Sequence, residues 1–265
     1  MDIKVRKVVI FAAGKGTRLS PITSYIPKEM LPIINFPVIH YVLEESLVDG
    51  IEQVILVIKK NKSLIAEYVR DYLNRREGKK KVGLEIVYQK DTHYGTAAAL
   101  IDARNHLKKE PFLTMFADSF ALKRDNRLKF LLRVYRQYRA PVISLIPAGP
   151  KEACTYGMVE AEEVEKDVVS IKRLVEKPGR NLKPPAYAAP NGYLLTPGII
   201  PYLDRLTPEK NGELSLVAAI TEYLEKNKVY GSVFKGLFFE AGNQVDFVDS
   251  QTKMILERKD LKRGY

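Results

Sequence analysis

Short apolar runs alternate with segments of helical spacing through residues 7–146 of this 265-residue chain. Within residues 38–48, apolar side chains recur every three or four positions, which is the period of an amphipathic helix. Such alternation favours an α/β fold with a mostly parallel, Rossmann-like sheet that helices cover on both faces. The expected strands are residues 7–13, 53–58, 84–88, 112–117 and 141–146, and the expected helices are residues 38–48, 63–76, 96–107 and 127–138.

The second half of the chain is less regular. Three Pro residues within residues 179–190 predict a loop there. Two alternatives stay open for the expected helix at residues 244–258, which packs either on its own sheet or against a partner in a homo-oligomer. The other expected elements are strands at residues 168–175 and 193–195, two short strands around Gly236 within residues 229–239, and a helix at residues 213–226.

Composition narrows the class of protein. Hydrophobic residues make up 46% of the chain, which is enough for a sizeable core and excludes general disorder. The single cysteine, Cys154, excludes an internal disulfide and a cysteine-based zinc site, and it favours a reducing, cytoplasmic location. No apolar run approaches the roughly 20 residues that a membrane helix needs, so no membrane partner is expected.

The chain is basic, with 43 Lys and Arg residues against 32 Asp and Glu residues and a formal net charge of +11. Such a balance suits nucleic acid or a phosphorylated small molecule, and it also fits a solvated surface rich in Lys and Glu. The basic residues are dispersed, and the sequence has no helix-turn-helix, zinc or RNP-type motif. We therefore expect no nucleic-acid partner.

A glycine-rich stretch, FAAGKGTRLSPIT at residues 11–23, follows the first expected strand. It is not a dinucleotide fingerprint, because Leu19 stands where the third glycine belongs, and it lacks the spacing of a P-loop. What remains is a run of backbone N–H groups from Ala13 to Thr17, with Lys15 and Arg18 as further donors, which suits a polyphosphate. The alternative is a tight turn with surface charges.

Three features lie at or just after the carboxyl end of an expected strand: the glycine-rich stretch, Gln89 and Asp118. The carboxyl ends of parallel strands meet at one edge of a sheet, where α/β proteins bind their ligands. We therefore expect these residues to converge on one site.

Several stretches together resemble the sugar-1-phosphate nucleotidylyltransferase family, most closely the bacterial-type UTP–glucose-1-phosphate uridylyltransferases. The resemblance covers almost the whole chain, and its specificity comes from the order of the pieces. In chain order these are AAGKGTRLSPIT, PKEMLPI, YQKDTHYGTAAAL, FADS, YGMVE, LVEKP, NGYLLTP, NGELSLVAAI and FFEAGN.

The resemblance implies a single nucleotidyltransferase domain over residues 1–265, of the nucleotide-diphospho-sugar transferase type. Residues 1–150 would be mainly the nucleotide-binding core, residues 151–240 mainly a smaller, β-rich part that binds the sugar phosphate, and residues 241–265 a C-terminal helix and tail. The implied substrates are UTP, or dTTP, and glucose 1-phosphate.

The resemblance also implies nucleotide-binding residues. Lys28, in PKEMLP, would stabilise charge on the phosphates in the transition state. The amide of Gln89 offers a donor and an acceptor that match the edge of uracil or thymine, and Gly95 would let the base pack on backbone. The remaining implied contacts are Ala12, Ala13 and Gly14 with the base and ribose, and Gly16, Thr17 and Arg18 with the phosphates.

On the sugar side, Glu176 would accept hydrogen bonds from sugar hydroxyls and Lys177 would bind the sugar's phosphate. Gly157, Asn191 and Gly192 would contact the sugar through backbone or amide groups. The implied catalytic residues are Arg18, Lys28, Asp118 and Lys177.

The implied cofactor is Mg²⁺ on Asp118, a carboxylate that ends an apolar strand. Glu240 stands where the family usually has an aspartate as the second ligand. The carboxylate of a glutamate is one methylene further from the backbone than that of an aspartate. Glu240 would therefore bind Mg²⁺ either directly or through water.

Three alternatives to uridylyl transfer remain on the sequence alone. The first is the same chemistry with thymine or another sugar, because YGTAAAL departs from the uridylyltransferase pattern and the spacing from Gln89 to Gly95 is one residue longer than expected. The second is a regulatory protein that binds nucleotide sugars without catalysis, which Glu240 keeps open. The third, a nucleic-acid binder, rests only on the net charge.

Overall fold

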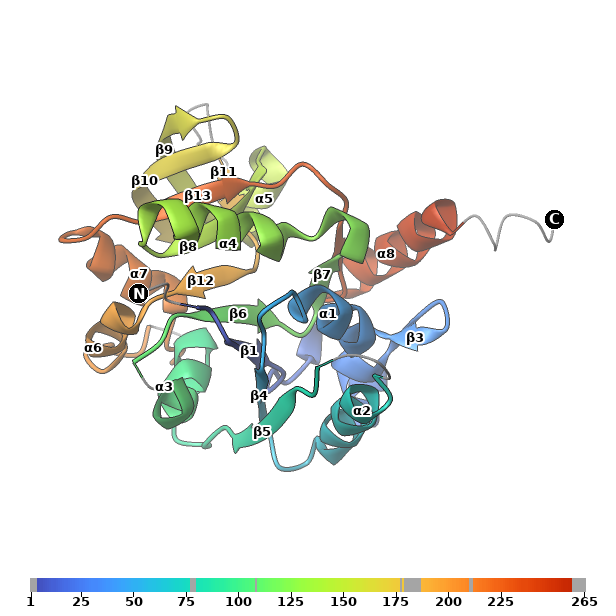
Figure 1. The fold of residues 1–265 in the computed structure, drawn as a ribbon. Coiled ribbons are helices and arrows are strands. Elements are labelled where there is room, and N and C mark those ends of the chain that lie inside the picture. The colour runs from blue at the N-terminus through green and yellow to red at the C-terminus, as the bar shows by residue number, and fades with distance from the viewer. Residues whose placement is uncertain are drawn as a thin grey trace.

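The structure, a computed structural model, describes residues 4–76, 80–107, 109–176, 178, 187–209 and 212–258. Within these residues a ten-stranded sheet runs through the molecule (Figure 1). Its strands, in spatial order, are β11 (Tyr187–Ala189), β9 (Gly157–Glu165), β10 (Val168–Glu176), β13 (Tyr230–Val233), β8 (Val142–Pro147), β12 (Tyr193–Leu195), β6 (Phe112–Phe116), β1 (Lys7–Phe11), β4 (Gln53–Ile58) and β5 (Gly83–Tyr88).

Strands β6, β1, β4 and β5 are parallel, with Val9 of β1 in register with Thr114 on one side and Ile55 on the other. Val8, Val9 and Ile10 are fully buried, as apolar runs are in a sheet that is covered on both faces. The α/β fold expected from the alternating pattern is confirmed.

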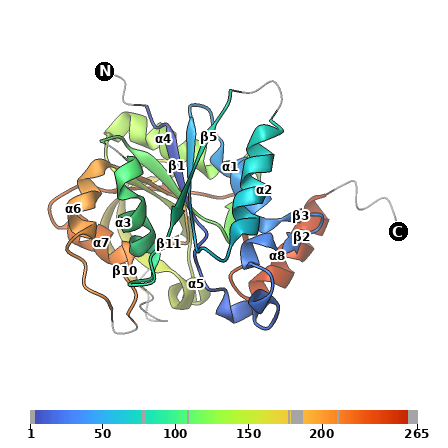
Figure 2. The same cartoon turned by 90° about the horizontal axis from the view of Figure 1, so that it is seen from below.

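Helices cover the two faces of the sheet (Figure 2). Val8 and Ile10 belong to the hydrophobic cluster on the first face, and Val9 belongs to the cluster on the second, because successive side chains of a strand point to opposite faces. The first face carries α1 (Val38–Ser46), α2 (Ser63–Asn74) and α4 (Arg127–Tyr138). The second carries α3 (Thr96–Leu107), α6 (Ile200–Leu203) and α7 (Leu216–Leu224).

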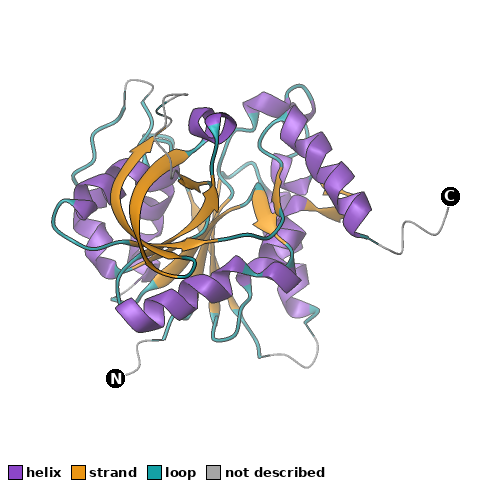
Figure 3. Ribbon diagram, turned by 90° about the horizontal axis from the view of Figure 1, so that it is seen from above, coloured by secondary structure: helices purple, strands orange, loops and turns teal. Residues whose placement is uncertain are grey.

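The other end of the sheet is mixed rather than parallel. β12 runs antiparallel to both β6 and β8, while β13 is parallel to β8. β11 pairs with both β9 and β8, so β8, β13, β10, β9 and β11 close on themselves, and Figure 3 shows their curvature. Of the loop expected at residues 179–190, residues 179–186 lie outside the described residues. The expectation is wrong for residues 187–189, which form β11 and pair with two strand edges.

Shorter elements complete the fold. β7 (Ser119–Ala121) pairs with β14 (Phe238–Glu240), and β2 (Pro32–Ile33) pairs with β3 (Phe36–Pro37). The remaining helices are α5 (Pro150–Thr155) and α8 (Gln244–Glu257), with 3₁₀ turns at Thr17–Leu19, Ile22–Ser24, Lys28–Met30, Lys123–Asp125 and Pro197–Ile199. In the described part of the chain, no helix has the length and apolar character to cross a membrane.

Candidate active site

A cavity of about 620 Å³ opens at the carboxyl ends of the parallel strands. It gathers residues that are far apart in the sequence, as expected for the ligand-binding edge of an α/β sheet. Ala12 is fully buried and is not part of the cavity lining. The residues singled out from the sequence that line the cavity are Ala13, Gly14, Gly16, Thr17, Arg18, Lys28, Gln89, Gly95 and Asp118.

The glycine-rich stretch forms an open loop, which we call the Gly loop (residues 12–18). Ala12 still continues the sheet, since its N–H donates to the Val57 carbonyl at 2.8 Å. Gly16 has φ of 73°, in the left-handed region, so a side chain there would strain the turn. Among the described residues, no acceptor is found for the N–H groups of residues 13–17. Several of these residues line the cavity, so the loop offers a set of unused donors to a ligand.

Lys28 and Asp118 form an ion pair within the cavity. Burial by itself raises the pKa of Asp118, but the charge of Lys28 and its hydrogen bond outweigh this, and the pKa lies below its usual value. Burial likewise lowers the pKa of Lys28, and Asp118, then Glu29, raise it above its usual value. Both groups are therefore charged at neutral pH.

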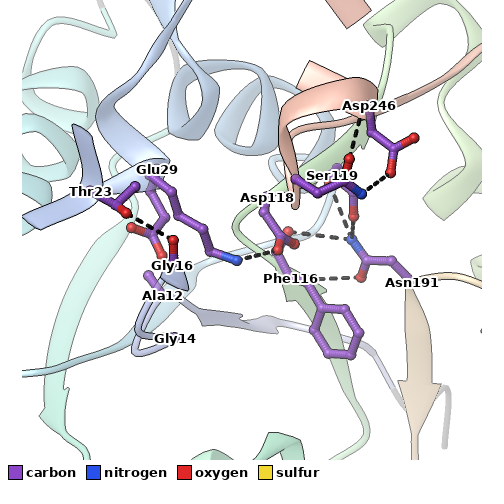
Figure 4. A network of polar contacts seen from close by, with 12 residues as sticks. Ala12, Gly14, Gly16, Thr23, Glu29, Phe116, Asp118, Ser119, Asn191 and Asp246 are labelled. Carbon is purple, nitrogen blue, oxygen red and sulfur yellow. Dashed lines mark hydrogen bonds and ion pairs between the residues drawn. The ribbon is translucent and has the colours of Figure 1, made fainter. Parts of the chain in front are cut away.

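Asn191 holds the backbone on both sides of Asp118 (Figure 4). Its side-chain oxygen accepts from the N–H of Phe116 at 2.9 Å, and its amide nitrogen donates to the Ser119 hydroxyl at 2.6 Å. The Asn191 carbonyl accepts from buried Arg127 at 3.1 Å. Asn191 is fully buried, so its amide is a support for Asp118, and the sequence did not indicate this role.

Gln89 and Gly95 lie next to each other in the cavity lining. The amide nitrogen of Gln89 donates to the Gly95 carbonyl at 3.4 Å. Gly95 has φ of 113°, and a β-carbon there would lie 2.4 Å from the Leu214 carbonyl oxygen. Backbone atoms cannot move aside as a flexible side chain can, so this position requires glycine. Tyr94 and Glu213, which sequence reasoning missed, line the same wall.

A buried ion pair behind the Gly loop was also missed. The ammonium nitrogen of Lys62 lies 2.9 Å from each carboxylate oxygen of Glu29. It also lies 3.0 Å from the Ala12 carbonyl and 2.7 Å from the Gly14 carbonyl. The one available signal was Glu29 itself, a charged residue that directly follows Lys28 in PKEMLP.

Glu240 is the neighbour of Asp118 in space, because β14 pairs Glu240 with Ser119. The carboxylate of Glu240 accepts a hydrogen bond from the hydroxyl of Tyr156. Burial, and then the charge of Glu240, raise the pKa of Tyr156, so its hydroxyl keeps its proton.

The donor set suits a divalent cation that prefers oxygen ligands. No group of three or more His, Cys, Asp or Glu side chains in the described ranges has the arrangement of a metal site. Mg²⁺, however, commonly uses one or two protein carboxylates and takes its other ligands from phosphates and water. Asp118 in the cavity wall, with Glu240 on the adjacent strand, fits that pattern.

The described residues assigned to the sugar phosphate are not themselves part of the cavity lining, although Asn191 bonds to Phe116, which is. Gly157 and Glu176 are paired across β9 and β10, and a β-carbon on Gly157 would lie 3.5 Å from both a Glu176 carboxylate oxygen and a Val217 methyl group. Gly192 follows Asn191, and its carbonyl accepts from the N–H of Ser144 at 2.9 Å. Lys177 lies outside the described residues.

The chain belongs to the nucleotidyl transferase family, whose model matches residues 7–255. It is similar to UTP–glucose-1-phosphate uridylyltransferases from Bacillus subtilis strain 168 and Streptococcus pneumoniae serotype 4. The first is 32% identical, with 98% of this chain and 94% of the relative covered. The second is 31% identical, with 99% and 94% covered.

Solved structures agree with this assignment of the fold. A crystal structure of UDP-glucose pyrophosphorylase complexed with UDP-glucose superposes with a TM-score of 0.87 and 29% identity, covering 96% of this chain and 100% of that chain. A glucose-1-phosphate thymidylyltransferase from Bacillus anthracis, described as putative, gives a TM-score of 0.76 at 21% identity, over 94% of this chain and 95% of that one. The second likeness concerns the fold alone.

Proposed function

We propose that this protein transfers a uridylyl group from UTP to glucose 1-phosphate, giving UDP-glucose and pyrophosphate. The proposal rests on the N–H groups of residues 13–17, which have no acceptor within the described part of the chain. These residues line the cavity together with Lys28 and Asp118. Donors of this kind suit a triphosphate. The full-length relatives that bear the name of this activity support the same choice of substrates.

In this proposal UTP lies along the edge of the sheet. The base packs at Gly95 and is read by the Gln89 amide, which still has an acceptor and a second donor to offer. The backbone of residues 12–14 contacts the base and ribose. Gly16, Thr17 and Arg18 hold the β- and γ-phosphates.

Glucose 1-phosphate approaches from the side of β9 and β10. Glu176 accepts hydrogen bonds from its hydroxyls, Gly157 contacts it through backbone, and Lys177 binds its phosphate. For Asn191 and Gly192 the contact is through backbone groups, because the side-chain amide of Asn191 already has partners at both its oxygen and its nitrogen.

An oxygen of the sugar's phosphate attacks the α-phosphorus of UTP, in line with the departing pyrophosphate. No covalent enzyme intermediate is needed, so catalysis consists of positioning and charge stabilisation. Lys28 and Arg18 stabilise the charge that moves onto pyrophosphate, and Lys177 brings up the attacking group. Mg²⁺ would be held by Asp118, with Glu240 as a direct or water-mediated ligand, and would supply further positive charge to stabilise the phosphates.

The test is a product analysis with MgCl₂, in which UTP, dTTP, CTP, ATP and GTP are each combined with glucose 1-phosphate, galactose 1-phosphate and N-acetylglucosamine 1-phosphate. We expect UDP-glucose as the main product. If dTDP-glucose were the main product, the preferred base would be thymine instead of uracil. UTP binding without pyrophosphate release would favour a nucleotide-sugar sensor. The cytoplasmic location and a homo-oligomeric state stay predictions.

A further inference from the structure

Three carbonyl groups of the Gly loop accept hydrogen bonds from side chains. Ala12 and Gly14 direct their carbonyl oxygens to the ammonium group of Lys62, at 3.0 and 2.7 Å. The Gly16 carbonyl accepts from the Thr23 hydroxyl at 2.8 Å (Figure 4). Side-chain donors of the protein therefore fix the carbonyls of residues 12, 14 and 16.

The direction of the carbonyl groups decides the direction of the N–H groups. In a planar trans peptide the C=O of one residue and the N–H of the next point in opposite directions. When Lys62 fixes the carbonyls of residues 12 and 14, it aims the N–H groups of residues 13 and 15 away from itself. Residues 13 and 15 line the cavity, and Lys62 is not part of the lining of that cavity.

Lys62 has no capacity left for a ligand. An ammonium group has three N–H donors, and these serve the Ala12 carbonyl, the Gly14 carbonyl and the Glu29 carboxylate. The Lys62 side chain is 10% exposed and the Glu29 side chain 1%. Lys62 lines a smaller neighbouring cavity, and its three donors are used, so its contacts point to a role through the Gly loop.

We propose that Lys62, with Glu29 as its counter-ion, is a positioning residue that holds the Gly loop ready for the nucleoside triphosphate. Glu29 also joins this support to the catalytic side, because it directly follows Lys28 in the 3₁₀ turn Lys28–Met30. The identity of the ligand as UTP rests on the proposed function.

Removing only one partner leaves a buried, uncompensated charge, which destabilises a protein strongly, whereas an apolar replacement of the whole pair is often tolerated. The variant to use is therefore the double substitution Lys62→Met/Glu29→Met. It keeps similar volume, removes the ammonium group that donates to both loop carbonyls and leaves no unpaired charge at this position. A melting temperature near that of the wild type shows that the variant is folded.

Lys7→Met is the matched control. Lys7 is also a buried lysine that donates to a backbone carbonyl, that of His106 at 2.8 Å, and it lies at the opposite end of β1 from the Gly loop. A general loss of stability would affect this variant as well. A positioning role in triphosphate binding affects only the Lys62/Glu29 variant.

The primary measurement is the Kd of UTP by calorimetry with the full chain, which does not require turnover. We expect about tenfold weaker binding in the double variant, as for a loop that is competent about one time in ten, and no change in Lys7→Met. In steady state the KM for UTP should rise while the KM for glucose 1-phosphate stays constant. Equal UTP affinity in the wild type and the double variant would overturn the inference.

The two proposals fail in different ways. If the wild type binds UTP and forms no UDP-glucose, only the proposed function fails, and the Kd comparison still decides the role of Lys62. If the wild type binds no UTP, both proposals are wrong. Equal weakening in Lys7→Met would also contradict the positioning role, because the effect would then be one of stability.

Discussion

The ammonium group of Lys28 pairs with the carboxylate of Asp118, although the two residues are 90 positions apart in the sequence. The pair joins PKEMLP to the end of β6, the two parts of the chain that carry the implied catalytic cation and metal ligand. In the proposed reaction Lys28 stabilises charge on the phosphates of UTP. The ion pair with Asp118 already holds it in the cavity in the absence of substrate.

Removal of the Lys28 ammonium group should reduce turnover. In Lys28→Ala we expect kcat to fall by about 100-fold or more, the usual cost of losing one group that stabilises charge in the transition state. Initial rates of pyrophosphate release measure this, and circular dichroism checks the fold. A rate like that of the wild type would remove Lys28 from the catalytic set.

Replacement of Glu240 tests its role toward magnesium. In Glu240→Ala we expect the Mg²⁺ concentration for half-maximal rate to rise, because the second of the two carboxylates is lost. Tyr156→Phe, which removes only the hydrogen bond to Glu240, should shift it less. The measurement is the initial rate as a function of Mg²⁺ concentration for the wild type, Glu240→Ala and Tyr156→Phe. An unchanged Mg²⁺ requirement in Glu240→Ala would show that Glu240 takes no part in binding the ion.

Gly95 should not tolerate a β-carbon. Gly95→Ala places a carbon 2.4 Å from the Leu214 carbonyl oxygen in a backbone of φ 113°, so we expect a lower melting temperature and weaker UTP binding. Gly83→Ala is the control, since its β-carbon would be 3.7 Å from the nearest atom, the Glu52 carbonyl oxygen. If the two variants melt alike, the packing described at Gly95 is wrong.

His40 should make stability depend on pH. Burial lowers the pKa of His40 in the folded protein, while Glu44 opposes the shift. The unfolded chain then takes up a proton below about pH 6.5 that the folded protein resists. We expect the unfolding free energy to decrease from pH 7.5 to pH 5.5, and to decrease less in His40→Gln. If urea unfolding gives an equal decrease in unfolding free energy between the two pH values for the wild type and His40→Gln, this contribution is ruled out.

The sequence predicted the parts of the fold that depend on local pattern. Helices at residues 96–107 and 127–138 agree with α3 and α4, because their apolar spacing and flanking residues are local signals. β11 was missed since its three residues gain their stability from pairing with β8 and β9, which a local pattern does not contain. Residues 213–215 were expected to be helical, but Ser215 caps α7, which starts at Leu216.

In the candidate site, too, the sequence predicted what depends on local pattern and missed what depends on contacts between distant segments. The strand-end position of Gln89 and Asp118 was readable because parallel strands end at one edge. The Lys62–Glu29 pair was not readable from the sequence. Lys and Glu are residues typical of a solvated surface, and only the fold buries these two against the Gly loop. Asn191 was placed at the sugar, and its bonds to Phe116 and Ser119 depend on β12 lying beside β6.

The central claim is uridylyl transfer in the cavity that Lys28 and Asp118 share. Its most direct test is pyrophosphate release from UTP with Mg²⁺, with and without glucose 1-phosphate, by the wild type and by Asp118→Asn. We predict release that requires glucose 1-phosphate, yields an equal amount of UDP-glucose and falls about 100-fold or more in Asp118→Asn. Release independent of the sugar phosphate, or equal rates in the two proteins, would contradict the account.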